Sequence, residues 1–120
     1  MNKRILIVDD AKVARLRLKD ILEACQYDVI AEAVDGNQAV EMYKQFRPDL
    51  VTMDITMPQK DGVEALEEII AIDKNAKVVM ITAIDQRNLL MKAIKLGATD
   101  YIIKPFEDDR VISAISKALA

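Results

Sequence analysis

The chain is organised around the stretch DLVTMDITMPQKDG, residues 49–62. Its first half is a short apolar run, typical of a buried strand, and this run ends in a carboxylate at Asp54. Pro58 and Gly62 then interrupt the chain before a helical pattern begins. A carboxylate at a strand end can be a turn former or a helix cap, so Asp54 alone does not identify a functional site. Its role depends on the residues that end the other strands.

The same change from an apolar run to a helical period recurs along the whole chain. Apolar runs rich in β-branched residues predict strands at 4–8, 29–33, 50–53, 77–82 and 101–103. Apolar residues at helical spacing predict helices at 11–25, 36–47, 63–73, 88–96 and about 108–119. We expect Asp108 or Asp109 to cap the last helix and Gly97 to end the fourth. The first helix should bury a stripe made of Val13, Leu16, Ile21, Leu22 and Cys25.

Strands that alternate with helices through short loops predict an α/β fold in which helices cover both faces of a parallel sheet. The expected architecture is a flavodoxin-like, three-layer αβα domain with five strands in the order 2-1-3-4-5 and five helices. We expect residues 1–120 to form this single domain, with no separate output domain.

Composition excludes several classes of function. The chain has no histidine, which removes imidazole metal sites and catalytic triads. Its net charge of −3 is spread along the sequence and offers no basic surface for nucleic acid or anionic membrane. Cys25 is the only cysteine, and no signal peptide or long apolar span is present, so we expect a soluble, cytoplasmic protein.

Five polar residues stand at the carboxyl ends of the predicted strands, where ligands bind in doubly wound sheets. They are Asp9, Asp10, Asp54, Thr82 and Lys104. In the expected strand order, Lys104 can reach back to Asp54. Converging carboxylates repel, by about 4 kcal/mol for two charges about 4 Å apart at an effective dielectric near 20. A divalent cation would relieve this repulsion, and an all-oxygen ligand set suits Mg²⁺ or Mn²⁺ better than Zn²⁺.

These groups together suit a phosphoryl group. A metal and Lys104 would neutralise its oxygens, Thr82 would donate a hydrogen bond, and ionised Asp54 could be the nucleophile. Taken singly, Asp10 could be a helix cap, Thr82 a strand end and Lys104 a solvated turn residue, and only their convergence favours chemistry.

Four motifs surround these strand ends. They are Ile7-Val-Asp9-Asp10, Met53-Asp54-Ile-Thr-Met57-Pro58 with Asp61-Gly62, Ile81-Thr82-Ala83 and Lys104-Pro105-Phe106. In order and spacing, the chain resembles the CheY-like receiver domains of two-component response regulators over essentially all of its 120 residues.

The resemblance implies a metal and phosphorylation site. Asp54 would be the phosphoacceptor. Asp10 would bind Mg²⁺ directly and Asp9 through water, while the backbone carbonyl of Thr56 completes the protein ligands. Mn²⁺ could substitute for Mg²⁺.

The resemblance also implies a conformational switch. Thr82 would move onto the phosphoryl group, Ala83 would leave room for it, Lys104 would pair with it, and Tyr101 would turn inward. Three residues would shape the site: Pro58, Gly62 and Pro105. The peptide bond between Lys104 and Pro105 would be in the cis form.

The implied function is a response regulator that takes a phosphoryl group from the phosphohistidine of a sensor kinase or phosphotransfer protein. The donor is expected to dock beside the first helix. The signal would leave through the face formed by residues 88–96, 101–103 and 108–119, which contacts a downstream protein. The only catalysis expected is self-phosphorylation from small donors and autodephosphorylation, so the chain is not expected to be an enzyme.

The pathway is left open by the sequence. Leu50 to Pro58 resembles stand-alone chemotaxis regulators, whereas Ala83-Ile84-Asp85-Gln86 departs from their usual pattern. A phosphorelay intermediate and a regulator of another enzyme therefore stay open. A Mg²⁺-dependent phosphohydrolase of the haloacid-dehalogenase type is a distant alternative, because its usual second aspartate is Thr56 here. In the family that the chain resembles, two positions that flank the site affect the lifetime of the aspartyl phosphate, and here they are Thr56 and Ile84. Ile84 cannot orient water, so the resemblance predicts a long-lived aspartyl phosphate.

Overall fold

The computed structural model describes residues 2–120. Strands and helices alternate along the chain, with one additional 3₁₀ turn before the fourth helix. The elements are β1 (Arg4–Val8), α1 (Lys12–Ala24), β2 (Asp28–Ala33), α2 (Gly36–Phe46), β3 (Leu50–Asp54), α3 (Gly62–Ile72), β4 (Val78–Ala83), η1 (Ile84–Gln86), α4 (Arg87–Leu96), β5 (Asp100–Lys104) and α5 (Asp108–Leu119).

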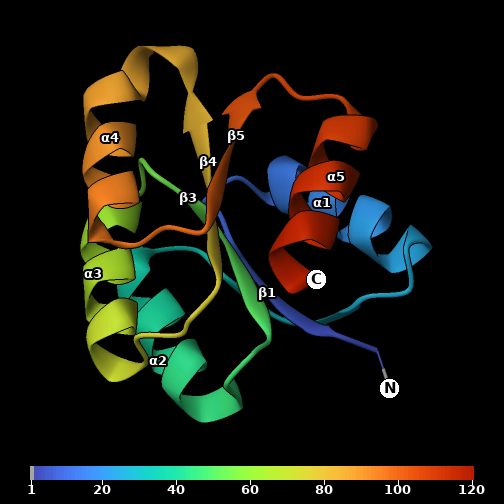
Figure 1. Cartoon of the computed structure of the whole chain (residues 1–120), viewed down its shortest axis with the longest axis horizontal. Coiled ribbons are helices and arrows are strands. Elements are labelled where there is room, and N and C mark those ends of the chain that lie inside the picture. Colours follow the sequence, from blue (N-terminus) through green and yellow to red (C-terminus); the bar gives the residue numbers. More distant parts are fainter. Residues whose placement is uncertain (1) are drawn as a thin grey trace.

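The strands form one parallel sheet in the order β2-β1-β3-β4-β5, as predicted. Helices α2, α3 and α4 cover one face, and α1 and α5 cover the other (Figure 1). Because all strands run the same way, their carboxyl ends meet at one edge of the sheet. This edge carries the predicted site.

The three inner strands β1, β3 and β4 are buried on both faces, as their continuous apolar sequences predict, whereas the edge strands β2 and β5 are partly exposed. In β1, Leu6 and Val8 pack into the cluster beneath α2 and α3, whereas Ile5 and Ile7 pack into the cluster beneath α1 and α5. This alternation follows from the two-residue period of a strand. The central strand β3 is fully buried along its length, so Asp54 is held by a rigid part of the core.

Gly62 is required by a close approach of α3 to the end of β3. Its N–H donates to the carbonyl of Ile55 at 2.7 Å. A Cβ atom at this position would lie 2.0 Å from the carbonyl oxygen of Asp54, a distance that no side chain tolerates. The Asp61 side chain caps α3 by accepting from the N–H of Glu64. The loop after Asp54 is therefore fixed at the glycine that the sequence singled out.

Two details of the helices differ from the predictions. Val13 is 80% exposed and Leu16 is 48% exposed, whereas Leu18 is buried. Leu16 and Leu18 are two residues apart and so lie on different sides of the helix, and the buried side contains Leu18, Ile21 and Leu22. The prediction that Val13 and Leu16 are buried together with Ile21 and Leu22 was therefore wrong.

The start of α5 also differs from the prediction. Neither Asp108 nor Asp109 is the N-cap; both lie in the first turn, after Glu107, and no side chain caps the helix. Their charges still suit the positive end of the helix dipole. Gly97 ends α4 in the left-handed conformation with φ of 113°, as predicted.

Among residues 2–120, no helix is long and apolar enough to cross a membrane.

Candidate functional site at the carboxyl end of the sheet

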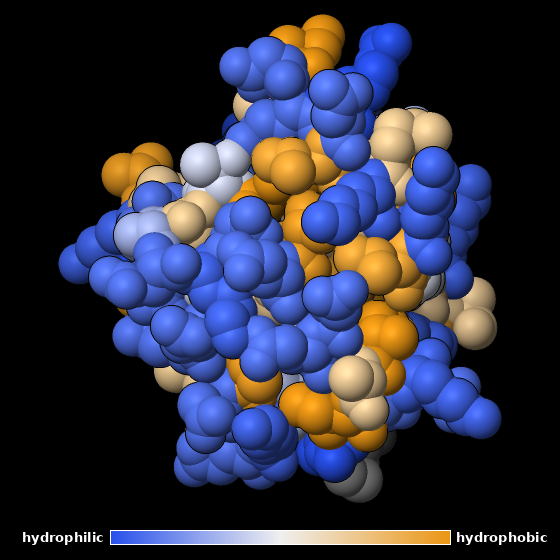
Figure 2. All heavy atoms as spheres, turned by 90° about the vertical axis from the view of Figure 1, so that its left-hand side faces the viewer, coloured by the Kyte–Doolittle hydropathy of each residue, from blue (hydrophilic) through white to orange (hydrophobic). Residues whose placement is uncertain are grey.

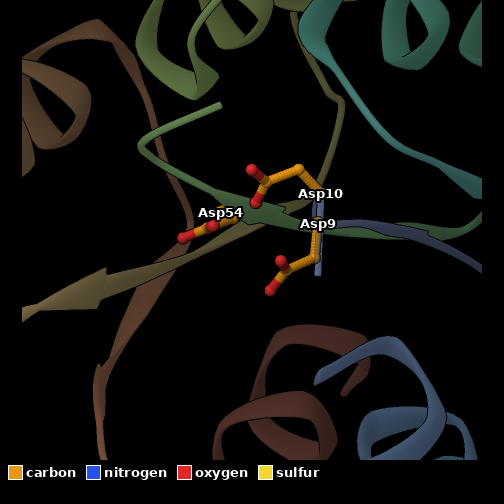
Figure 3. Close-up of side chains that lie close together, drawn as sticks. All are labelled: Asp9, Asp10 and Asp54. Atoms are coloured by element: carbon orange, nitrogen blue, oxygen red, sulfur yellow. The ribbon is translucent and has the colours of Figure 1, made fainter. Parts of the chain in front are cut away.

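Three carboxylates meet where β1 and β3 end. Val8 pairs with Met53, and this register places Asp9 and Asp10 beside Asp54. One oxygen from each of the three carboxylates lies within 4.8 Å of the others. Figure 3 shows the three side chains gathered at this one end of the sheet. Asp9 and Asp54 are buried and Asp10 is exposed, so the cluster opens to solvent on one side.

Lys104, at the end of β5, forms ion pairs with two of these carboxylates. Its Nζ lies 3.2 Å from Oδ2 of Asp9 and 3.5 Å from Oδ1 of Asp54. The predicted reach of Lys104 to Asp54 is therefore present, and Asp9 is a second partner that the sequence did not reveal. The peptide bond between Lys104 and Pro105 is cis, as predicted.

The position of Asp54 disfavours its charge. Burial raises its pKa, the neighbouring Asp9 raises it further and Lys104 lowers it, which leaves the pKa of Asp54 at about 6. Burial lowers the pKa of Lys104, but the charges of Asp54 and Asp9 outweigh burial, and the pKa of Lys104 is raised. Asp54 is thus ionised at neutral pH but unfavourably placed, and positive charge nearby stabilises it.

The donor set fits a hard divalent cation. Carboxylate oxygens from three residues converge, and the described residues contain no histidine with which to build a zinc site. A cation would also offset the repulsion that raises the pKa of Asp54. Asp9, Asp10 and Asp54 are the residues that would hold it. Thr56 lies in the loop two residues after Asp54 with its side chain exposed, and its carbonyl remains a predicted ligand.

Thr82 is the second-last residue of β4 and lies beside this cluster. Ile81 pairs with Asp54 in the sheet, so Thr82 lies one residue beyond that pair. The Thr82 side chain is buried, and its hydroxyl contacts Ala83 and Gln86 rather than an acidic residue. Ala83 follows, half-buried.

Two other predicted residues lie outside this cluster, since Tyr101 is the second residue of β5 and Pro58 lies in the loop after β3. Tyr101 is on β5 with its side chain 36% exposed, and the guanidinium of Arg110 lies 6.0 Å from the centre of its ring. Pro58 is exposed in the loop after β3.

Two residues that the sequence did not single out for this site also contact it. Arg15 donates from Nη1 to the carbonyl of Asp9 at 2.7 Å and from Nε to Glu32 at 3.0 Å. Gln86 folds back from η1 onto the end of β4. An arginine in the first turns of a helix that follows a strand end could have indicated a contact with that strand end. The contact of Gln86 depends on the 3₁₀ turn η1, which the apolar pattern does not show.

Comparison with known proteins gives consistent matches over the whole chain. The family described as the response regulator receiver domain matches residues 5–116. The chain is 54% identical over 119 residues to the chemotaxis protein CheY of Bacillus subtilis (strain 168), with 99% of both chains covered. It is 50% identical over 117 residues to CheY of Thermotoga maritima, with 98% of both covered.

Solved structures agree with this match. A chain of the CheX–CheY–BeF3–Mg²⁺ complex from Borrelia burgdorferi superposes with a TM-score of 0.93 at 35% identity, covering 98% of this chain and 90% of that chain. The response regulator domain of Thermotoga maritima CheB superposes with a TM-score of 0.90 at 31% identity, covering 99% of this chain and 97% of that chain.

Proposed function

The chain belongs to the response regulator receiver domain family, and on this premise we propose that it accepts a phosphoryl group on Asp54 and signals to a downstream protein. The observation that carries the proposal is the cluster of Asp9, Asp10 and Asp54, with Lys104 placed between two of its members. This cluster provides a nucleophile, a cation site and a fixed positive charge within one small volume.

The transfer step needs no further acid or base from the chain. An oxygen of the Asp54 carboxylate attacks the phosphorus of a phosphohistidine on the donor protein. The phosphorus–nitrogen bond breaks, and its electron pair returns to the imidazole of the donor, which takes a proton from solvent. When bound, Mg²⁺ supplies charge neutralisation of the phosphoryl oxygens.

Lys104 and Thr82 act on the product. After transfer, Asp54 no longer carries the same negative charge, and Lys104 can pair with an oxygen of the phosphoryl group. The hydroxyl of Thr82 supplies a neutral donor from the adjacent strand. The half-buried Ala83 leaves space beside them.

The outgoing signal is proposed to pass through the face formed by α4, β5 and α5. Apolar side chains reach the surface on the side of the molecule that carries α3 and α4 (Figure 2), and α4 is the helix that this side shares with the proposed face. The exposed apolar residues of the proposed face are Leu89, Met91, Ile94, Tyr101, Ile103 and Ile112. Leu90 and Ala93 anchor α4 in the core, so the exposed members are free to contact a partner. Phosphorylation then acts as a population shift between two states of this face.

Chemotaxis is the setting that the relatives support. Both CheY proteins align over nearly their full lengths with nearly the full length of the chain, which favours a role in chemotaxis. A phosphorelay intermediate is the second candidate, favoured by the Ala83–Gln86 segment that departs from the usual chemotaxis pattern. The two differ in whether the phosphoryl group can pass from Asp54 to a second histidine protein.

The proposal is tested by incubating the protein with a small acyl phosphate and Mg²⁺ and measuring its intact mass. We expect the mass to increase by one phosphoryl group, and chelation of the metal to suppress the increase. Asp54→Asn should gain no mass, while Asp85→Asn, at an exposed aspartate of η1, should behave as wild type. If the wild type remains unmodified, or Asp54→Asn is modified equally, the proposal is wrong.

A further inference from the structure

Gln86 folds back onto the end of β4 from the last position of η1. Its Oε1 accepts from the backbone N–H of Ala83 at 3.0 Å. The orientation of the carboxamide follows from chemistry, because an N–H group can only donate and must face the oxygen rather than the nitrogen. The Gln86 side chain is therefore anchored on the backbone immediately after Thr82.

The same oxygen lies near the hydroxyl of Thr82. Thr82 Oγ1 is 3.4 Å from Oε1 of Gln86 and 3.0 Å from the carbonyl oxygen of Ala83. A hydroxyl has one proton, and Thr82 is only 1% exposed, so the proton is donated to one of these two acceptors rather than to bulk water. Both acceptors belong to residues 83–86, which comprise the last residue of β4 and the η1 turn.

This arrangement competes with the role proposed above for Thr82. The phosphoryl oxygens on Asp54 are acceptors and need the hydroxyl proton. To donate there, Thr82 must give up the acceptors of the 83–86 segment. Gln86 strengthens the existing arrangement because it adds an acceptor for Thr82 and also fixes the Ala83 backbone.

We propose that Gln86 is a positioning residue that holds Thr82 in the unphosphorylated arrangement and must release it when Asp54 carries a phosphoryl group. The inference rests on the proposed function, since it assumes that Thr82 binds that group. It adds that the fourth residue after Thr82 sets how readily the phosphorylated state forms. A hydrogen bond between neutral groups has a net value that corresponds to about a two- to tenfold change in an equilibrium constant.

The test uses beryllofluoride as a stable stand-in for the phosphoryl group, titrated into the full chain at saturating Mg²⁺ and followed by calorimetry. We expect Gln86→Ala to bind beryllofluoride about two- to tenfold more tightly than wild type, with an unchanged affinity for Mg²⁺ alone. Gln86→Met keeps the side-chain length but lacks the acceptor. It should show the same gain in affinity, which distinguishes loss of the acceptor from a loosening of the turn by the smaller alanine. Asn88→Ala is the matched control, because it removes an exposed carboxamide from the first turn of α4.

A second set of variants separates an action through Thr82 from a general effect on the loop. Thr82→Val keeps the shape of the side chain but removes the hydroxyl, so adding Gln86→Ala to it should not increase the affinity further. The inference is overturned if Gln86→Ala and Gln86→Met leave the affinity unchanged or lower it, or if the gain persists in the Thr82→Val background. A wild type that binds no beryllofluoride at all would instead count against the proposed function.

Discussion

Asp54 should make the metal-free protein less stable than it would be with a neutral side chain at this position. Burial and the adjacent Asp9 raise the pKa of Asp54 from 3.8 to about 6, against the opposing effect of Lys104. A displacement of this size corresponds to about 3 kcal/mol between the two protonation states. The side chain is only 10% exposed, so solvent screens little of this cost. Asp54→Asn removes the charge but also the ion pair with Lys104, so we expect the variant to be about 1 to 3 kcal/mol more stable at pH 7.

The pH dependence has a definite sign. A carboxyl group with a raised pKa in the folded state binds more protons folded than unfolded between pH 3.8 and about 6. The wild type therefore loses stability as the pH rises through this window, whereas Asp54→Asn does not. The difference between the two proteins should be small near pH 4 and complete by pH 7.

The assay is urea unfolding followed by circular dichroism, in chelator and then in excess Mg²⁺. Magnesium should stabilise the wild type more than the variant, because the variant lacks one carboxylate ligand. Asp20→Asn, at an exposed position of α1, is the matched control and should change stability by less than about 0.5 kcal/mol. A variant that is no more stable than wild type at pH 7 in chelator would refute this account of the site.

Three further predictions concern Gly62, Tyr43 and Ile84. Gly62→Ala should destabilise the protein by more than about 2 kcal/mol in urea unfolding, since its Cβ would lie 2.0 Å from the carbonyl oxygen of Asp54; a loss below about 0.5 kcal/mol would show that the loop can move aside. Burial and the hydrogen bond to Asp73 raise the pKa of Tyr43 to about 12, so the wild type should lose stability as the pH rises from 10 to 12, and Tyr43→Phe should lack this loss. Equal alkaline profiles would contradict that reading. Ile84→Glu, at a residue that is 76% exposed, should shorten the lifetime of the phosphorylated protein, measured as loss of labelled phosphate, without changing its unfolding free energy; an unchanged or longer lifetime would refute the proposed role of this position.

The sheet and its site could be predicted from the sequence because the patterns that specify them are local and repeated. Each strand is a continuous apolar run, and parallel strands bring their last residues to one edge. This was sufficient to place Asp9, Asp10 and Asp54 together and to bring Lys104 within reach of them.

Side-chain contacts that depend on how an element is turned could not be predicted in this way. The apolar pattern of α1 includes Val13 and Leu16, but the helix buries the side that contains Leu18 and leaves those two exposed. Gln86 reaches Ala83 only because a 3₁₀ turn precedes α4, and three residues with no apolar period do not reveal such a turn. The contact of Lys104 with Asp9 likewise depends on the distance between the ends of β5 and β1, which are not neighbours in the sheet.

The proposed function requires that Asp54 is the residue that receives the phosphoryl group. The most direct measurement is to phosphorylate the protein with a small acyl phosphate and Mg²⁺, reduce the aspartyl phosphate with borohydride, and locate the resulting homoserine by peptide mass spectrometry. We expect homoserine at position 54 and at no other aspartate. Homoserine at position 9 or 10, or its absence from the whole chain, would contradict it.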